Sequence, residues 1–212
     1  MKDIIIYGSG GLARETVELI ENINEIKPEW NIKGYIDDIR GAEGGDINGY
    51  KILGTNKILE NMDSSVYIVL AVSDPSAKEK IYQEIKKYNM KFATLIHPSA
   101  KIAKNATIGD GSIISLDCLV SVNTYIGDHV FLNMRTVVGH DAVIKNYCSC
   151  LVNCIIAGNV VINEGVLLGS GCIIMEKKKI GKNAKISMGS AVYFDVEENA
   201  VVMSRPSKSM KF

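Results

Sequence analysis

Aliphatic residues recur at every sixth position through the second half of the chain. The series begins at Ile96 and ends at Val192, and 16 of its 17 members are Ile, Leu or Val. Four residues after each member, the side chain is nearly always small. Six residues are too few for a helical repeat, but they suit a short strand and a sharp turn with the aliphatic side chain facing inward. The pattern therefore predicts stacked coils of a parallel β-helix, three units to a coil.

The first half alternates strand and helix patterns instead. Residues 3–23 read as a buried strand, a glycine turn and an amphipathic helix. Residues 33–38 read as a second strand, and residues 66–88 as a third strand followed by a helix. Such alternation predicts a parallel sheet with a ligand crevice at its strand ends. We therefore expect a Rossmann-like βαβ domain over residues 1–95 and an all-β helix domain over residues 96–212.

Glycine and acidic residues gather at these predicted strand ends. The turn over residues 8–13 fits G-x-G-x-x-A, in which bare backbone at a helix N-terminus admits a phosphate or a ribose. Asp37 and Asp38 end the second strand, and Ser73 ends the third. The glycine motif alone leaves two interpretations open, an NAD site or merely a tight turn. The glycine-rich residues 40–50 are expected to be a mobile surface connection.

Charge and cysteine content narrow the class of protein. Lys plus Arg equals Asp plus Glu at 24 each, so the chain has no net positive charge that would attract nucleic acid or an anionic membrane. No apolar run is long enough to cross a bilayer, and the N-terminus has no secretory pattern. Five cysteines, an odd number, indicate a reducing compartment. We expect a cytoplasmic protein without nucleic-acid binding or membrane insertion.

The cysteines and histidines of the second half first suggest a metal site, but their register argues against one. Four cysteines occupy the small-residue position and the fifth the aliphatic position, where they are expected to fill the core. These are Cys118, Cys148, Cys154, Cys172 and, at the aliphatic position, Cys150. The three histidines, His97, His129 and His140, belong to units on three different faces of the predicted helix. No metal site is therefore predicted within one subunit, although a site shared between subunits stays open.

His140 differs from the cysteines because it is expected at a turn. It lies two places after the inward Val138, Asp141 follows it, and Gly158 lies 18 residues later, one coil further on. Bare backbone beside an edge histidine leaves room for a ligand chain. A solvated turn histidine is the alternative. Charged residues 175–180 interrupt the pattern, and Lys178 in a small-residue position predicts a distorted turn that keeps the register.

A Rossmann-like domain with a glycine turn and an Asp-Asp pair, joined to a hexapeptide helix carrying His-Asp, resembles one family closely. It is that of the hexapeptide-repeat sugar-nucleotide and sialic acid acetyltransferases, typified by the UDP-4-amino-sugar N-acetyltransferase of bacillosamine synthesis. The resemblance implies a left-handed parallel β-helix and a homotrimer. It further implies acetyl-CoA as co-substrate along the helix between subunits, a sugar nucleotide held by the N-terminal domain, and no metal.

The resemblance also assigns residues. His140 matches the catalytic base, Asp141 the acidic residue that orients it, and Asn133 an asparagine near the reacting centre. The implied sugar-nucleotide contacts are Gly10, Gly11, Leu12, Asp37, Asp38 and Ser73. The implied coenzyme contacts are Ser149, Gly158, Ser170, Met188 and Lys208. The chain departs from the family at four of its positions, where Leu12 and Ser149 replace histidines, Met188 replaces a glycine and Glu176 a proline.

The leading interpretation is thus an acetyl-CoA-dependent acetyltransferase acting on an amino-sugar nucleotide, with a histidine base and an orienting aspartate. An O-acetyltransferase on sialic acid or a related sugar is one alternative. An NAD-linked oxidoreductase is favoured only by the glycine turn. A nucleotide-binding assembly protein without catalytic activity is allowed by the departures at Ser149 and Met188. The sequence does not select the sugar or its nucleotide carrier.

Overall fold

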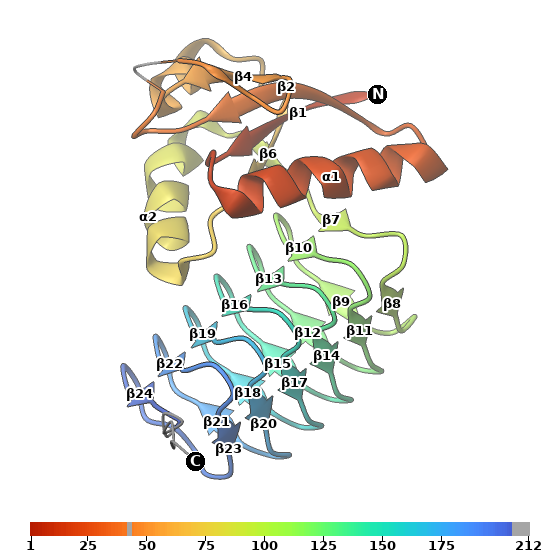
Figure 1. The fold of residues 1–212 in the computed structure, drawn as a ribbon, viewed down its shortest axis with the longest axis vertical. Coiled ribbons are helices and arrows are strands. Elements are labelled where there is room, and N and C mark those ends of the chain that lie inside the picture. The colour runs from red at the N-terminus through yellow and green to blue at the C-terminus, as the bar shows by residue number, and fades with distance from the viewer. Residues whose placement is uncertain (42–43, 205–212) are drawn as a thin grey trace, which may run out of the picture.

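The N-terminal domain is a twisted sheet flanked by two helices (Figure 1). The computed structural model describes residues 1–41 and 44–204. The sheet order is β3-β4-β2-β1-β5-β6, and all neighbours are parallel except β3 and β4. Its strands are β1 (Lys2–Tyr7), β2 (Trp30–Ile36), β3 (Asp46–Ile47), β4 (Tyr50–Gly54), β5 (Tyr67–Leu70) and β6 (Lys91–Phe92). The helices are α1 (Gly11–Ile26) and α2 (Pro75–Ile85), with 3₁₀ turns η1 (Asn56–Asn61) and η2 (Lys86–Tyr88).

Helix α1 lies between this sheet and the second domain (Figure 1). It buries one face, which carries Val17, Leu19 and Ile20, against the sheet. The same apolar core includes Ile113 and Phe131 of the second domain. Burial of large apolar side chains is the main favourable term in folding, so this shared core holds the two domains together.

Residues 44–54 contain a hairpin rather than the mobile connection expected over residues 40–50. Strands β3 and β4 pair antiparallel, with Asp46 opposite Lys51. Asn48 and Gly49 form the turn at φ values of 51° and 84°. Positive φ at both central residues is typical of the hairpin turns that Asn-Gly favours. The expected mobile connection is therefore wrong for residues 44–50, because Asn-Gly between two short strands favours a hairpin.

The second domain is a triangular prism of three parallel sheets (Figure 1). The β7 sheet consists of β7 (Leu95–Ile96), β10 (Ile113–Ile114), β13 (Phe131–Leu132), β16 (Ser149–Cys150), β19 (Leu167–Leu168), β22 (Lys185–Ile186) and β24 (Val201–Val202). The β8 sheet consists of β8 (Lys101–Ile102), β11 (Leu119–Val120), β14 (Val137–Val138), β17 (Ile155–Ile156), β20 (Ile173–Ile174) and β23 (Ala191–Val192). The β9 sheet consists of β9 (Thr107–Ile108), β12 (Tyr125–Ile126), β15 (Val143–Ile144), β18 (Val161–Ile162) and β21 (Lys179–Ile180).

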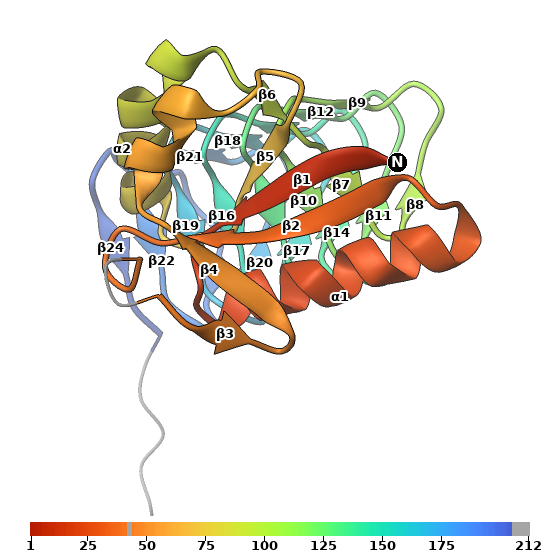
Figure 2. The same cartoon turned by 90° about the horizontal axis from the view of Figure 1, so that it is seen from above.

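From β7 to β23, paired strands differ by 18 residues, as with Val138 and Ile156, so the predicted coil length is confirmed. The last pair, β22 and β24, is shorter, with Lys185 opposite Val201. The N-terminal domain lies over the β7 sheet, as the view from above shows (Figure 2). The predicted division between residues 95 and 96 falls inside β7.

Most corners of the prism contain a residue with left-handed backbone. Between residues 111 and 189 these positive φ values recur every six positions, and Asn, Asp or Gly occupies most of them. These residue types tolerate the left-handed region best. Lys177 occupies one such position at φ 59°, and the backbone N–H of Lys177 donates to the carbonyl of Gly158 at 3.0 Å. The turn within residues 175–180 is therefore regular. The register persists as expected, but the expected distortion is wrong.

The inward positions form a dry core. All five cysteines are buried at 1% exposure or less, which confirms their predicted role as core residues. Within residues 1–41 and 44–204, no group of three or more His, Cys, Asp and Glu side chains is arranged to hold a metal. Ile96 is an exception among the inward residues at 36% exposure, because β7 pairs with a single neighbour at the end of the prism.

Helix α2 contacts the prism through a buried lysine and a group of aromatic rings. The Lys78 ammonium is fully buried, and its Nζ donates to Ser149 Oγ at 3.0 Å and to the Cys148 carbonyl at 3.3 Å. Burial lowers the pKa of Lys78 to about 8. Nearby, His129 stacks on Tyr147 with an angle of 3° between the rings, and Tyr82 of α2 packs beside both. None of these contacts was anticipated from the sequence.

Candidate active site

His140 and Asp141 are joined by a hydrogen bond at a corner of the prism. They follow β14, and His140 Nδ1 lies 2.8 Å from Asp141 Oδ2. A carboxylate only accepts hydrogen bonds, so Nδ1 donates to Asp141, and in the neutral imidazole Nε2 carries the lone pair. The imidazole is 58% exposed, so a ligand at this corner can reach the ring. This arrangement suits a base that is oriented by a carboxylate.

Asp141 is itself fixed from two sides. Its φ of 58° places it in the left-handed position of the corner. Asn123, one coil earlier, donates from Nδ2 to Asp141 Oδ1 at 3.0 Å. The hydrogen bond with His140, followed by that from Asn123, holds the pKa of Asp141 below its ordinary value. The carboxylate therefore stays ionised beside the imidazole, and Asn123 is a supporting residue that the sequence interpretation missed.

Gly158 lies directly against the imidazole. A Cβ atom at this position would fall 2.6 Å from His140 Nε2, closer than real side chains approach. Glycine is therefore required for the observed ring position, whatever else it contacts. We name this corner the His140 edge; it comprises residues 121–123, 139–141, 157–159, 175–177 and 193–195, which follow successive strands of the β8 sheet.

Asn133, Ser170 and Met188 lie at a different corner. This Asn133 edge follows the strands β13, β19 and β22 of the β7 sheet. The Asn133 side chain is 9% exposed, and its Oδ1 accepts from the backbone N–H of Met134 at 2.7 Å. Met188 is 69% exposed. The β8 sheet separates the two edges, so one chain does not bring Asn133 to His140.

The β8 sheet between these edges carries exposed apolar side chains in one column. Leu119, Ile155 and Ile173 are 42%, 40% and 47% exposed, and Val137 lies between the first two. Strand registers place them one coil apart on the outer face. A continuous apolar column flanked by predicted site residues is typical of a protein–protein contact.

Ser149 does not fit the predicted coenzyme contact. Its side chain is fully buried beneath α2, where the Lys78 amine donates to it. It lies on the β7 sheet, which the N-terminal domain covers, and not on the face next to His140. The prediction for Ser149 is therefore wrong within this chain, because the residue is enclosed at the contact between domains. Lys208 lies outside the described residues.

The predicted nucleotide residues gather at the carboxyl ends of β1, β2 and β5. Gly8 has a φ of 106°, and a Cβ there would lie 2.9 Å from the carbonyl oxygen of Ala71. Gly10 is the N-cap of α1, and Gly11 is its first residue. Asp37 and Asp38 follow β2, and the exposed Ser73 follows β5 at the neighbouring strand end. Parallel neighbours place these residues along one edge of the sheet.

Leu12, by contrast, packs into the core between α1 and the prism. It is half-buried and packs against the apolar core that α1 shares with the sheet and the prism. Its assignment as a substrate contact rested on a family histidine that this chain lacks. The contact stays a prediction without support from the packing.

The two aspartates hold the crevice loops in place. Asp37 accepts from Ser9 Oγ at 2.5 Å and from the backbone N–H groups of Ile39 and Arg40 at 2.9 Å each. Partial burial raises the pKa of Asp37, but these hydrogen bonds outweigh it and hold the pKa below its ordinary value. Asp37 therefore stays an acceptor at neutral pH.

Asp38 connects the ends of two strands to η1. It accepts from the Tyr7 hydroxyl and, at 2.8 Å, from the backbone N–H of Asn56. Burial, with the Asp38 hydrogen bond, raises the pKa of Tyr7, so the phenol stays protonated. Ser9, Tyr7 and Asn56 were not identified from sequence, because their roles depend on the pairing of β1 with β2.

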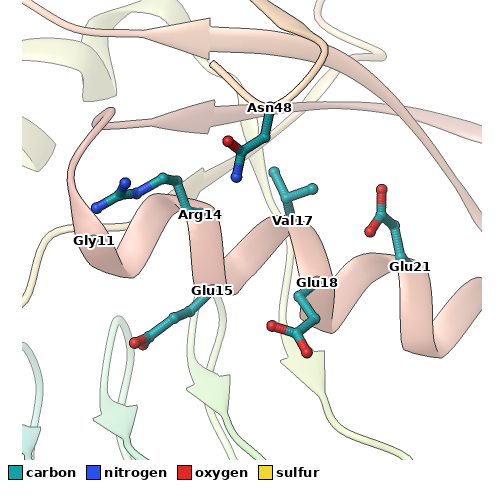
Figure 3. A pocket seen from close by; sticks show the side chains of 7 residues that line it. All are labelled: Gly11, Arg14, Glu15, Val17, Glu18, Glu21 and Asn48. Atoms are coloured by element: carbon teal, nitrogen blue, oxygen red, sulfur yellow. The ribbon is translucent and has the colours of Figure 1, made fainter.

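Two open cavities flank this crevice. One, of about 420 Å³, lies beside Asp38 and includes Asn56, Lys57 and Lys80 in its wall. The other, of about 510 Å³, runs along α1 beside Gly11 (Figure 3). Its wall carries the carboxylates of Glu15, Glu18 and Glu21 and the guanidinium of Arg14. The cavity along α1 has three carboxylates and one guanidinium, whereas the cavity beside Asp38 balances Lys57 and Lys80 with Asp38 and Glu84. The second cavity repels a phosphate less and therefore suits a nucleotide better.

The geometry thus defines a Rossmann-like crevice joined to a β-helix with an exposed His-Asp pair. Residues 3–85 match the PglD N-terminal domain family. The chain is 28% identical over 174 residues to the GDP-perosamine N-acetyltransferase of Escherichia coli O157:H7, covering 81% of this chain and 77% of that protein. It is 30% identical over 117 residues to the UDP-N-acetylbacillosamine N-acetyltransferase of Bacillus subtilis (strain 168), covering 54% of this chain and 51% of that protein.

Solved structures share the whole architecture. The acetyltransferase domain of PglB from Neisseria gonorrhoeae superposes with a TM-score of 0.88 at 24% identity, covering 99% of this chain and 100% of that one. PerB from Caulobacter crescentus, in complex with CoA and GDP-perosamine, superposes with a TM-score of 0.85 at 20% identity, covering 94% and 92%. The predicted left-handed β-helix and the predicted resemblance to sugar-nucleotide acetyltransferases are both confirmed. Among the described residues, no helix is long and apolar enough to cross a membrane.

Proposed function

We propose that this protein is an acetyl-CoA-dependent N-acetyltransferase that acts on an amino-sugar nucleotide. The observation that carries the proposal is the exposed His140 imidazole, held through Nδ1 by Asp141 with its Nε2 free. The similarity to enzymes named for GDP-perosamine and UDP-N-acetylbacillosamine supports the substrate class.

The proposed reaction needs a base and no redox group. The amine nitrogen of the sugar attacks the thioester carbonyl, and His140 Nε2 takes the proton that the nitrogen loses. Collapse of the tetrahedral adduct breaks the carbon–sulfur bond, and the sulfur leaves as coenzyme A after it regains a proton. Asp141 stabilises the imidazolium that forms between these steps. A general base of this kind typically accelerates a reaction 10²–10⁴-fold.

The sugar nucleotide is assigned to the crevice of the N-terminal domain. Gly10 and Gly11 present bare backbone at the start of α1, which suits close approach by a phosphate or ribose. Asp38 lies at the cavity that also carries Lys57 and Lys80. Lysines beside the crevice favour a diphosphate, and a carboxylate accepts from a ribose hydroxyl or a base N–H. No comparable observation favours the NAD-linked alternative.

A homotrimer forms part of the proposal. The apolar column through Leu119, Ile155 and Ile173 is exposed to solvent in a single chain. Packing against the prism of a second copy would bury it. Contact across the β8 sheet would set the His140 edge of one copy beside the Asn133 edge of its neighbour. The predicted coenzyme contacts Gly158 and Ser170 lie on these two edges, which supports a coenzyme site shared between subunits.

The test measures thiol release from acetyl-CoA with GDP- and UDP-linked 4-amino sugars as acceptors. We expect turnover by the wild type and a loss of 10²–10⁴-fold in kcat for His140→Ala with CoA affinity little changed. Lys104→Ala, an exposed change on the first coil, serves as the control with normal turnover. An acetylated product that resists mild base indicates an amide, whereas an ester would be cleaved and would support the O-acetyl alternative. Turnover by His140→Ala within threefold of the wild type would remove this residue from the mechanism.

A further inference from the structure

The carboxylate of Asp141 is held by a hydrogen bond at each of its two oxygen atoms. Oδ2 lies 2.8 Å from His140 Nδ1, and Oδ1 accepts from Asn123 Nδ2 at 3.0 Å. Asn105, one coil earlier again, donates from its own Nδ2 to Asn123 Oδ1. Two amides therefore stack behind the carboxylate in successive coils, on the side of the base that leads to the N-terminal end of the prism.

The direction of this chain of amides is fixed by the carboxylate at its end. The pKa of Asp141 lies below its ordinary value, so the group is ionised near neutral pH and only accepts hydrogen bonds. Asn123 must therefore present its amide nitrogen to Asp141 and its carbonyl oxygen to Asn105. That oxygen in turn requires the donor that Asn105 supplies. The three side chains are thus held in a single hydrogen-bonding arrangement.

The backbone of the prism brings Asn123 and Asp141 into register. Both occupy the left-handed position of their corner, at φ values of 57° and 58°. The backbone N–H of Asp141 donates to the carbonyl of Val122 at 3.0 Å, which stacks one corner on the next. With matching backbone and a spacing of about 4.8 Å between coils, the two side chains lie side by side. Their contact follows from the regular coil and not from a chance surface conformation.

The pair of His140 and Asp141 needs this support because it is open to water. The two side chains are 58% and 45% exposed, and an exposed pair contributes little by itself. The last torsion of an aspartate has a broad range, so a carboxylate held at one oxygen can turn toward water instead. In a neutral imidazole, the hydrogen bond at one nitrogen sets which nitrogen carries the hydrogen. A carboxylate that turned away would release Nδ1 and let the hydrogen move to Nε2, the atom assigned as base.

A second amide ladder in the prism provides a comparison. At another corner, Asn183 also has a φ of 57°, and its Nδ2 donates to Asn199 Oδ1 at 3.3 Å. This ladder ends on an amide and not on a carboxylate, and no histidine adjoins either residue in the sequence. The two ladders share their backbone and differ in the group that they hold, so Asn183 is a matched control for Asn123.

We propose that Asn123 is a positioning residue for the base: by holding Asp141, it keeps His140 in the tautomer with the hydrogen on Nδ1 and the lone pair on Nε2. Asn105 supports the Asn123 amide in the same chain of hydrogen bonds. The inference rests on the proposed function, in which Nε2 takes the proton from the acceptor amine. Asn123 acts through the carboxylate and is assigned no contact with either substrate.

The direct test is nitrogen NMR of the histidine side chains in the wild type, Asn123→Gly and Asn183→Gly. Glycine adopts a φ of 57° without strain, so each variant loses its amide while the corner keeps its backbone. The His140 signal is identified by its absence from His140→Ala. At a pH where the ring is neutral, we expect the Nδ1–H tautomer in the wild type and in Asn183→Gly. Asn123→Gly should show a mixture shifted toward the Nε2–H tautomer.

Steady-state kinetics gives a second readout that general damage to the prism would not reproduce. Asn123→Gly should lower kcat about tenfold, the cost of one hydrogen bond to a charged group, with the KM values of acetyl-CoA and the acceptor little changed. Asn183→Gly should keep the wild-type kcat. In an Asp141→Gly background, Asn123→Gly should reduce kcat no further, because its effect passes through the missing carboxylate.

The outcomes separate this inference from the proposed function. An unchanged His140 tautomer in Asn123→Gly, or an equal loss of kcat in the two glycine variants, would overturn the inference alone. A further loss of kcat in the Asp141→Gly background would show that Asn123 acts on a ligand directly and would also overturn it. If the wild type acetylates no acceptor, the proposed activity fails, while the tautomer comparison still decides whether Asn123 positions the ring.

Discussion

The imidazole of His140 rests on the backbone of Gly158, one coil further along the prism, with no room for a methyl group between them. Gly158→Ala should therefore displace the ring while the inward core stays filled. We expect kcat to fall roughly 10- to 100-fold, because small misplacement of a catalytic group costs this much. Steady-state kinetics with acetyl-CoA and the amino-sugar nucleotide measures the effect.

A double-mutant cycle separates this effect from a lost ligand contact. If Gly158→Ala acts through the imidazole, it should reduce kcat no further in a His140→Ala background. An equal reduction in both backgrounds would show that Gly158 acts on the coenzyme directly, as the family resemblance implies.

Asp38 should affect the sugar nucleotide and not the coenzyme. Its carboxylate lies at the crevice beside Lys57, far along the chain from the prism edges. Asp38→Asn still accepts from Tyr7 and Asn56 but loses the charge, so the Kd of the sugar nucleotide should rise about tenfold. Calorimetry with coenzyme A should show no change. Asp3→Asn, at the opposite end of β1, is the control. Equal losses for both ligands would contradict the division of binding between the domains.

His129 should make the fold sensitive to mild acid. Its ring is 3% exposed, and burial, with a smaller effect of Lys78, lowers its pKa to about 4. As the pH falls, His129 is therefore protonated near pH 6.5 in the unfolded chain but only near pH 4 in the native state. Stability is full above pH 6.5 and falls as the pH drops through this window, by up to about 3 kcal/mol. Urea unfolding at pH 7 and pH 5 measures the loss.

The matched variant is His129→Asn, because the φ of 53° at this position suits asparagine. The variant loses aromatic packing and should be less stable at pH 7, but it should lose less stability between pH 7 and pH 5. Other titrating groups act on both proteins alike. If the two proteins lose stability equally over this interval, His129 is not the acid-sensitive group.

Cys154 should matter to packing and not to chemistry. Its thiol donates to the Gly169 carbonyl at 3.3 Å, and the Cys172 thiol lies 3.6 Å away. Cys154→Ala removes a small buried group and should cost about 1 kcal/mol of unfolding free energy, a little more if the lost hydrogen bond counts fully. Turnover at permissive temperature should be unchanged. Loss of activity in a folded variant, or stoichiometric zinc in the purified protein, would return the metal interpretation to consideration.

The hexapeptide pattern was sufficient to predict the prism and the corner position of His140. Each hexapeptide places one aliphatic side chain inward, as Val138 and Ile156 do, and this rule repeats along the chain without reference to distant residues. The same register places His140 at a corner and Gly158 one coil further on, so their contact follows from an 18-residue spacing. Local turn chemistry could also have found the hairpin at Asn48 and Gly49 and the left-handed corner residues.

The contacts between the two domains depend on long-range packing and could not be predicted from the sequence. Ser149 is buried beneath Lys78, and His129 is enclosed by Tyr82 and Tyr147, because α2 docks on the β7 sheet. No period in the sequence specifies which face of a three-sided prism the N-terminal domain covers. That choice depends on the apolar core that α1 shares with residues such as Phe131. It is also what leaves the β8 sheet and the His140 edge exposed, because burying one face of the prism sets which others remain free to bind.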